Sequence, residues 1–488
     1  IDSSKNLIRD VIEPTDGYSL VSTIDMNLTK ILSDTASEWF YETDENGERV
    51  RTAKSYSILA MDPNTGAIKA MVTDTDYDLN NPNDLSSFYT DEELATFADN
   101  EVKSEEYEKY LEKEQEKLKE QAEASKEKAD DDDSSTQDII EIATASPYAA
   151  YLNEKGEWDH SAYPTTTDVK NEIWRNGIIS NSFEPGSTGK VLTYAAAIEE
   201  GLITEDTQFD DSEGYLNIGR TMVKCHNYAL GGCGIIDAKD AVAQSCNVAF
   251  MEIGKILGPE LFVKYQQLHN FGQKTGIDLP GETTGIVYGD RMTTIDAACN
   301  SFGQTINVNM MQMMAAYCSI INGGMLYQPH IVKRIESANG EVVKEYKANL
   351  VRQTITASTS KLLRRYLKNT VEEGTAKKAG VTGYSVAGKT GTAQKGDRKD
   401  NKWIISFIGH APAENPKFAI YVVIDEPYGT TGTSGSSADV LTLTHNILEK
   451  LLPYMNVYKD ASDEYEDTSS SPDELTVDGI PAGTASSN

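Results

Sequence analysis

Strand-like segments lie at both ends of this chain, and helical patterns fill the region between them. Near the start, residues 55–62 and 67–73 are apolar and are joined by a Pro-Asn-Thr-Gly turn, which predicts an antiparallel hairpin. Near the end, residues 403–409 and 418–425 are rich in Ile, Val, Phe, Tyr and Trp, which is typical of buried strands. This order predicts an α+β domain whose antiparallel sheet joins the first and last segments.

Apolar residues three or four positions apart predict the helices between these strands. We expect helices over residues 22–40, 191–201, 237–258, 307–322, 358–373 and 439–455. Gly201 can end the second of them in the left-handed conformation. Hydrophobic residues make up 39% of the chain, which excludes wholesale disorder.

The formal net charge is −33, and much of it comes from two stretches. Residues 91–133 hold 18 acidic and 7 basic side chains, and residues 459–488 hold 8 and 1. Such a chain repels phosphate backbones, so nucleic acid is not an expected partner. We interpret residues 91–133 as a solvated helix that frays into an Asp run, with a partner-binding helix as the alternative.

These patterns predict the domain organisation. We expect a linker over residues 1–17, one domain built from 18–80 and 168–456, an insertion with an acidic, partly disordered segment over 81–167, and a disordered acidic tail over 457–488. No apolar run approaches 18 residues, so we expect no membrane-spanning helix in this sequence. The chain begins without Met and reads as a piece of something longer.

One Ser-x-x-Lys motif stands in a setting suited to catalysis. Ser187 follows a Pro-Gly turn and precedes an apolar helix, where backbone N–H groups favour an oxyanion. Lys190 lies on the same face three residues later, and a Lys in a dry pocket can accept the serine proton. The other two matches lack this setting, because Ser125 lies in the charged run and Ser358 in a Thr/Ser stretch typical of a helix cap.

Two further motifs also need context. Lys389-Thr390-Gly391 leads into a polar turn and the strand at 403, which predicts a hairpin whose Lys and Thr can bind a carboxylate. Residues 274–276 repeat Lys-Thr-Gly, but Ile-Asp-Leu-Pro-Gly follows and cannot continue as a central strand. Ser245-Cys246-Asn247 lies in a helix-rich stretch, whereas the other Ser-x-Asn matches lie in linker, turn or tail sequence.

Taken in order, these three motifs resemble the signature of penicillin-binding proteins and serine β-lactamases. Spacings of 58 residues from Ser187 to Ser245 and 144 from Ser245 to Lys389 agree. The stretches "WRNGIISNSFEPGSTGK", "FGQKTGIDLPGE", "SFGQTINVNMMQMMAAYCSIINGG" and "VAGKTGTAQK" resemble class B penicillin-binding proteins of Gram-positive type, in the division or spore-cortex branch. The resemblance covers residues 16–455 outside the insertion. It implies a transpeptidase fold, with an antiparallel sheet flanked by helices and an all-helical subdomain.

The resemblance also assigns roles by position. It implies that Ser187 is the acylated nucleophile, Lys190 its general base and Ser245 a proton relay to the leaving group, while Asn247 binds the substrate peptide. It further implies that Lys389, with Thr390 and Thr392, binds the terminal carboxylate, and that the N–H groups of Ser187 and Thr392 form the oxyanion hole. Gly391 is the substrate-binding position at which a ligand can approach the backbone. For Asn247 a buried structural amide is the alternative.

The implied activity is that of a D,D-transpeptidase that cross-links peptidoglycan stem peptides. A D-Ala-D-Ala donor acylates the serine, an amine acceptor resolves the acyl-enzyme, and β-lactams inhibit it by acylation. The family implies no cofactor, a place on the extracytoplasmic membrane face with an N-terminal anchor, and a lipid-carrier-dependent glycosyltransferase as partner. A β-lactamase, a β-lactam sensor and a non-catalytic cell-wall scaffold remain as alternatives.

The five cysteines form no CxxC pair and the six histidines no HExxH motif, so we expect no metal site. Cys225 can pair with Cys246 or Cys233 in an oxidising exterior. A bond between Cys225 and Cys246 would act on the Ser245–Asn247 motif as a redox switch. Free, half-buried thiols are the alternative.

Overall fold

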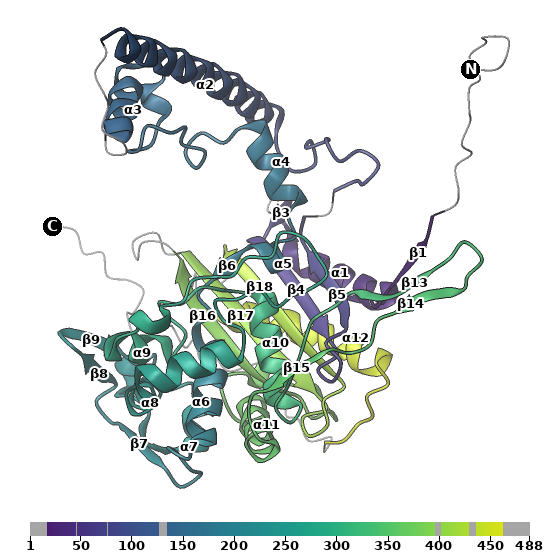
Figure 1. Cartoon of the computed structure of the whole chain (residues 1–488). Coiled ribbons are helices and arrows are strands. Elements are labelled where there is room, and N and C mark those ends of the chain that lie inside the picture. The colour runs from purple at the N-terminus through teal and green to yellow at the C-terminus, as the bar shows by residue number, and fades with distance from the viewer. Residues whose placement is uncertain are drawn as a thin grey trace, which may run out of the picture. The chain divides into compact units, whose positions relative to one another are not determined.

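The computed structural model describes residues 17–44, 46–75, 77–125, 134–395, 402–428 and 436–461. These residues form two compact units. One is Thr75–Asn176, and the other contains the described residues on either side of it (Figure 1). The predicted insertion at 81–167 lies inside the first unit, which extends further at both ends.

A five-stranded antiparallel sheet forms the centre of the larger unit, in the order β16-β17-β18-β4-β5 (Figure 1). The strands are β4 (Ala53–Met61), β5 (Ile68–Thr73), β16 (Ala387–Lys395), β17 (Lys402–Ala411) and β18 (Phe418–Pro427). Strand β18 pairs with β4 from Ala419 opposite Met61 to Pro427 opposite Ala53. This pairing confirms the prediction that the sheet joins the first and last segments.

Side chains of β18 alternate between two hydrophobic cores, as the two-residue period of a strand requires. Tyr421 and Val423 belong to the core that also contains helix α6 (Lys190–Glu199) and helix α10 (Met310–Ile321). Ile420 and Val422 belong to the core formed with α1 (Met26–Phe40) and α12 (Ala438–Tyr454). The sheet is therefore covered on both faces, and the apolar run of β18 is explained.

The helices predicted from periodicity are confirmed, with two corrections. Helix α1 begins four residues later than expected because Asp25 caps it, accepting from the N–H groups of Asn27 and Leu28, while Ser22 belongs to a strand. The helix expected over 237–258 is wrong in being continuous: the structure has α7 (Ala238–Ala243) and α8 (Asn247–Leu268), separated at Ser245. The expected end at Gly258 coincides with a non-helical residue that interrupts α8. The remaining helices of this unit are α5 (Gly177–Ser180), α9 (Thr294–Asn300) and α11 (Ala357–Glu372).

Small sheets surround this core. One has three strands, β1 (Ser19–Ser22), β13 (Val332–Glu336) and β14 (Val342–Glu345). The two-stranded sheets pair β2 (Tyr41–Thr43) with β3 (Arg49–Arg51), β6 (Ser182–Phe183) with β11 (Val308–Asn309), β7 (Gln208–Asp211) with β10 (Gly234–Asp237), β8 (Tyr215–Ile218) with β9 (Thr221–Lys224), and β12 (Met325–Tyr327) with β15 (Leu350–Gln353). The helical subdomain around α7, α8 and α9 thus also carries the β7–β10 and β8–β9 pairs.

The smaller unit, Thr75–Asn176, contains α2 (Asp91–Ser125), α3 (Ser134–Ala145) and α4 (Thr166–Trp174). Its compact core is formed by Leu85, Val169 and Ile173. Glu101 on α2 accepts hydrogen bonds from the backbone and the hydroxyl of Thr167, at 2.8 and 2.7 Å. The part of the acidic run that the structure describes, residues 91–125, is helical throughout.

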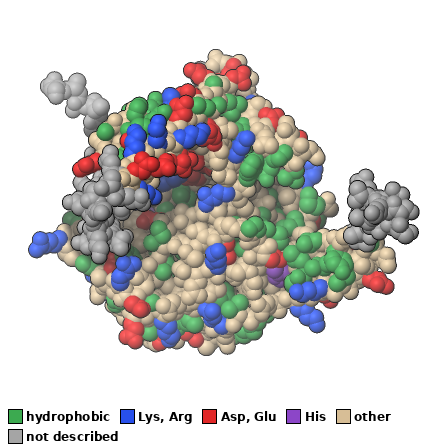
Figure 2. Space-filling view, turned by 45° about the horizontal axis from the view of Figure 1, so that its top comes forward, with side chains coloured by type: hydrophobic (Ala, Val, Ile, Leu, Met, Phe, Trp, Pro, Cys, Tyr) green, Lys and Arg blue, Asp and Glu red, His purple; other side chains and the backbone are tan. Residues whose placement is uncertain are grey.

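Parts of several predictions lie outside the described residues: the linker up to residue 16, the Asp run at 126–133, the turn at 396–401 and the tail from 462. Within the described residues, no helix combines the length and apolar character needed to cross a membrane. On the face drawn in Figure 2, acidic and basic side chains are interspersed and hydrophobic side chains form separate groups.

Candidate active site

A tight turn carries Ser187 to the start of helix α6. Residues Gly186–Gly189 form a single 3₁₀ turn that continues directly into α6. Gly186 has a φ of 53°, and its N–H donates to the carbonyl of Gly303 at 3.1 Å. The hydroxyl of Thr188 donates to the carbonyl of Pro185 at 2.7 Å. These bonds fix the turn, so the partly exposed Ser187 is held on a rigid element.

Lys190 lies three residues beyond Ser187 and is 1% exposed. Its Nζ donates to the carbonyl and the hydroxyl of Ser245, at 2.6 and 3.1 Å, and to Oδ1 of Asn247 at 2.7 Å. Burial lowers the pKa of Lys190 to about 8. An amine with that pKa can exchange a proton near neutral pH, and its contacts join the first motif to the second.

The second motif is placed by the break between α7 and α8. Ser245 has a φ of 56°, which is uncommon for a residue other than glycine and costs about 1–3 kcal/mol that the surrounding contacts must offset. Cys246 caps α8, with its sulfur accepting from the N–H of Ala249 at 3.4 Å. Ser245 and Asn247 thereby both face Lys190, which a continuous helix would not allow.

Strand β16 packs directly against the turn that carries Ser187. A Cβ added to Gly186 would lie 2.4 Å from the carbonyl oxygen of Thr392, and one added to Gly391 would lie 2.9 Å from the carbonyl oxygen of Pro185. Glycine is required at both positions because the two backbones touch there. The backbone of Thr392 is therefore adjacent to the nucleophile turn, as an oxyanion hole made by both segments requires.

Lys389 is fully buried on β16. Its Nζ donates to the carbonyl and hydroxyl oxygens of Thr390, at 3.3 and 3.4 Å. Burial, and then the nearby charge of Lys190, holds the pKa of Lys389 well below its usual range. No acidic side chain of the described residues forms an ion pair with Lys389, so a substrate carboxylate would relieve this unfavourable environment.

The structure thus brings together all of the candidate catalytic and carboxylate-binding residues and leaves the rejected motifs elsewhere. Ser125 ends helix α2 in the smaller unit. Ser358 lies at the start of α11, where its Oγ is 2.9 Å from Oγ1 of the cap residue Thr356. Thr275 of the second Lys-Thr-Gly donates its N–H to Glu282 at 2.7 Å, a contact within a loop.

Sequence reasoning did not identify Glu184 as part of the site. Its Oε1 accepts the N–H of Thr305 at 2.8 Å, and Thr305 has a φ of 60°. This bond is a second link between the loop around Gly303 and the segment leading to Ser187. Its position immediately before Pro-Gly-Ser was the only clue in the sequence.

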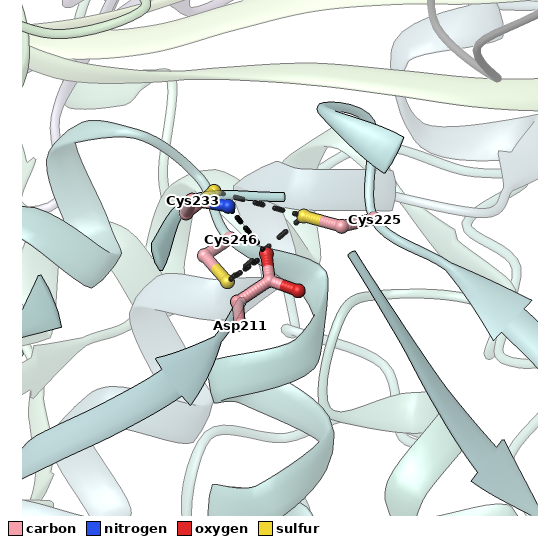
Figure 3. A group of neighbouring side chains, drawn as sticks. All are labelled: Asp211, Cys225, Cys233 and Cys246. Carbon is pink, nitrogen blue, oxygen red and sulfur yellow. Dashed lines mark hydrogen bonds between the residues drawn. The ribbon is translucent and has the colours of Figure 1, made fainter. Parts of the chain in front are cut away.

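A second group surrounds Cys246; sequence reasoning considered contacts among its three cysteines but missed Asp211 and the arrangement as metal ligands. The side chains of Asp211, Cys225, Cys233 and Cys246 converge, with their ligand atoms all within 4.8 Å of one another (Figure 3). Such a group could hold a metal ion, contrary to the expectation of no metal site. No local motif predicts it, because the residues come from three separate segments: the end of β7, the loop at 225–233 and the start of α8. All five cysteines are free thiols in the structure.

Comparisons with known proteins agree with this geometry. The family model for the penicillin binding protein transpeptidase domain matches residues 121–449. The chain is 40% identical over 289 residues to Stage V sporulation protein D of Bacillus subtilis, covering 58% of this chain and 44% of that protein. It is 32% identical over 297 residues to penicillin-binding protein PbpB of Mycolicibacterium smegmatis, covering 58% and 45%. The chain therefore spans less than half the length of these relatives.

The fold agrees as well. The crystal structure of penicillin-binding protein 3 from Mycobacterium tuberculosis superposes with a TM-score of 0.64 at 22% identity, covering 93% of this chain and 83% of that one. The match of the family model spans more than half of the chain and includes all three motifs. This chain belongs to the penicillin-binding protein transpeptidase domain family.

Proposed function

We propose that this chain is a serine D,D-transpeptidase that cross-links peptidoglycan stem peptides through an acyl-enzyme on Ser187. The observation that carries the proposal is the position of Lys190, buried and bonded to both Ser245 and Asn247. Two motifs that are separate in the sequence thus meet at one amine with a pKa of about 8. Perturbed pKa values of this kind are concentrated at functional sites.

Acylation begins when neutral Lys190 takes the proton from Ser187 Oγ, which attacks the carbonyl carbon of the penultimate D-Ala. At a pKa of about 8, about one Lys190 in ten is neutral at pH 7. The N–H groups of Ser187 and Thr392 receive the oxyanion. The packing of Gly186 against the backbone of Thr392 supports this pairing of donors.

Collapse of the tetrahedral intermediate expels D-Ala, whose nitrogen needs a proton. Ser245 is suited to relay it, because its hydroxyl lies 3.1 Å from Lys190 Nζ. An amine of a neighbouring stem peptide then attacks the acyl-enzyme, and the same relay runs in reverse. Asn247 binds the peptide backbone through Nδ2, because its Oδ1 accepts the hydrogen bond from Lys190.

The terminal carboxylate of the donor peptide binds to Lys389, with Thr390 and Thr392 as hydrogen-bond donors. Burial disfavours the charged form of Lys389 in the free protein. A bound carboxylate restores that charge through an ion pair in a place with little water, where such a pair is strong. The need for a free carboxylate at the end of the substrate follows directly.

A β-lactam presents the same carboxylate and acylating carbonyl, so we expect it to acylate Ser187. One solved relative of similar fold is described as a complex with ampicillin. We further propose that Thr75–Asn176 is an insertion into the transpeptidase domain, because the sheet is completed by strands on both sides of it. An N-terminal membrane anchor on the extracytoplasmic face and a glycosyltransferase partner are proposals from the family.

The proposal is tested with a synthetic stem pentapeptide ending in D-Ala-D-Ala and an added amine acceptor. We expect release of one D-Ala and a new amide with the acceptor, and neither product from Ser187→Ala. Release of D-Ala without the amide would mean a carboxypeptidase, and hydrolysis of β-lactams alone would mean a lactamase. A folded protein that is acylated by β-lactam but inert toward peptides would mean a sensor.

A further inference from the structure

Four potential metal ligands converge immediately behind the second motif (Figure 3). Asp211 ends strand β7, Cys225 follows β9, Cys233 precedes β10 and Cys246 caps α8. Asp211, Cys225 and Cys246 are 1%, 0% and 0% exposed, and Cys233 is half-buried. Three thiols and a carboxylate thus share one largely dry position.

Three of the six distances between the four ligand atoms are close to the edges of a tetrahedral site, and all six are within 4.8 Å. A zinc ion bonds to thiolate sulfur at about 2.3 Å, so two sulfurs on a tetrahedron lie about 3.8 Å apart. Cys225 Sγ lies 3.8 Å from Cys233 Sγ and 3.9 Å from Cys246 Sγ. Oδ2 of Asp211 lies 3.2 Å from Cys246 Sγ, close to the shorter edge that one oxygen ligand produces.

The polar groups around the cluster are also those of a metal site. The sulfur of Cys246 accepts a hydrogen bond from the N–H of Ala249, and the sulfur of Cys233 accepts one from Nδ2 of Asn227. Ligating thiolates commonly accept such hydrogen bonds. Within the described part of the chain, Oδ1 of Asp211 is buried without a hydrogen-bond partner. A buried carboxylate oxygen without a partner is costly unless a cation or a donor satisfies it.

We propose that Asp211, Cys225, Cys233 and Cys246 bind one thiophilic divalent cation, with Zn²⁺ as the expected ion. Soft thiolates favour Zn²⁺ over Mg²⁺ and Ca²⁺, which take oxygen ligands. Four protein ligands leave no open position, which is typical of a structural site rather than a hydrolytic one. The ion ties the β7–β10 pair and the loop at 225–233 to the start of α8.

The position of Cys246 gives this ion a consequence for catalysis. Cys246 lies between Ser245 and Asn247, and Ser245 has the left-handed φ of 56°. A metal bond to Cys246 anchors the backbone at that strained position and holds both neighbouring side chains toward Lys190. This positioning role rests on the proposed function, whereas metal binding itself does not.

A disulfide between Cys225 and Cys246 competes for the same thiols. Its sulfurs would have to approach to about 2.05 Å, from 3.9 Å in the structure. Such a bond leaves Cys233 and Asp211 without a role, whereas the metal uses all four side chains. The two states exclude each other, because a sulfur in a disulfide is no longer a thiolate ligand.

The test measures metal content of the reduced, folded chain. After incubation with Zn²⁺ and dialysis against a weak chelator, we expect about one zinc per chain by elemental analysis. Cobalt in place of zinc should give the strong visible bands of a tetrahedral site and a thiolate charge-transfer band. The proposal would be overturned if the reduced, folded protein retains no zinc and, after incubation with cobalt, shows neither the visible bands nor the charge-transfer band.

Matched variants identify the ligands. Cys233→Ser should retain less than a tenth of the zinc of the wild type, and Cys233→His, which restores a ligand but no thiol, should regain binding. Cys299→Ser removes another half-buried cysteine and should leave the zinc content unchanged. Equal zinc in Cys233→Ser and Cys299→Ser would contradict the assigned ligands. Circular dichroism verifies that each variant is folded.

The catalytic consequence has a separate readout. Removing zinc under reducing conditions should lower the rate of benzylpenicillin acylation at least tenfold, and zinc should restore it. Zinc binding without any effect on acylation would refute the positioning role and leave the site. Zinc binding in a protein that benzylpenicillin never acylates would refute the proposed function instead.

Discussion

Replacing Gly186 by alanine tests how tightly strand β16 must pack against the nucleophile turn. Gly186 has a φ of 53°, and an added Cβ would meet the carbonyl oxygen of Thr392 at 2.4 Å and its carbonyl carbon at 2.9 Å. Gly201 provides a matched control. Its φ is 67°, and nothing lies within 4 Å of an added Cβ.

The magnitude follows from these contacts. Both variants carry the cost of a left-handed alanine, about 1–2 kcal/mol. Only Gly186→Ala also has a backbone clash, and since close C···O contacts lie at about 3.3 Å or more, the two backbones must separate by about 1 Å. A displacement of that size between reacting groups can lower a rate about 100-fold.

The assay is the second-order rate of acylation by a fluorescent penicillin, with urea unfolding of the same samples. We expect Gly186→Ala to lose about 100-fold in rate and Gly201→Ala to stay within about twofold of wild type, although both lose stability. Equal acylation rates in the two variants would refute the idea that contact between the turn and Thr392 determines the geometry of the active site.

Three further outcomes follow from the buried charges. The acylation rate should rise with pH through about 8 and then level off, because Lys190 must be neutral to accept the proton. The acylation rate of Lys190→Arg should be about 10²–10⁴-fold lower at every pH, and a flat pH profile of the wild type in stopped-flow measurements would exclude Lys190 as the base. Glu184→Ala should lose about 1–2 kcal/mol in urea unfolding because the N–H of Thr305 loses its acceptor, whereas Glu184→Gln should retain most of it. Burial lowers the pKa values of His269 and His410 to about 4 and 3, so the unfolded state takes up protons first as the pH falls. The contribution of these two neutral histidines to the free energy of unfolding is complete above pH 6.5 and disappears as the pH falls toward 3. Free energies of unfolding that do not fall between pH 6.5 and 4 would contradict this.

Long apolar patterns made most of the fold predictable. The run at 418–425 indicated a buried strand, and the structure shows it between two strands and two cores. Most residues of the site were also predictable, because the sequence around each functional motif differs from the sequence around the other matches to the same motif. Thr275 shows why that works: the Pro-Gly after it prevents a strand, and its N–H binds Glu282.

Features that depend on contacts distant in the sequence were missed. The break at Ser245 was not predicted because a left-handed serine has no local signature, and its helix-forming neighbours suggested a continuous helix. The link from Glu184 to Thr305 spans 121 residues. Asp211 joins the three cysteines because the end of β7, the loop at 225–233 and the start of α8 meet, and no spacing rule describes that meeting.

The measurement that tests the central claim most directly is intact-mass spectrometry after mixing with benzylpenicillin, followed by peptide mapping. The account predicts a stable adduct of one penicillin per chain, located on the peptide that contains Ser187 and absent from Ser187→Ala. An adduct that persists in Ser187→Ala, or rapid return of wild type to its unmodified mass with consumption of penicillin, would contradict it.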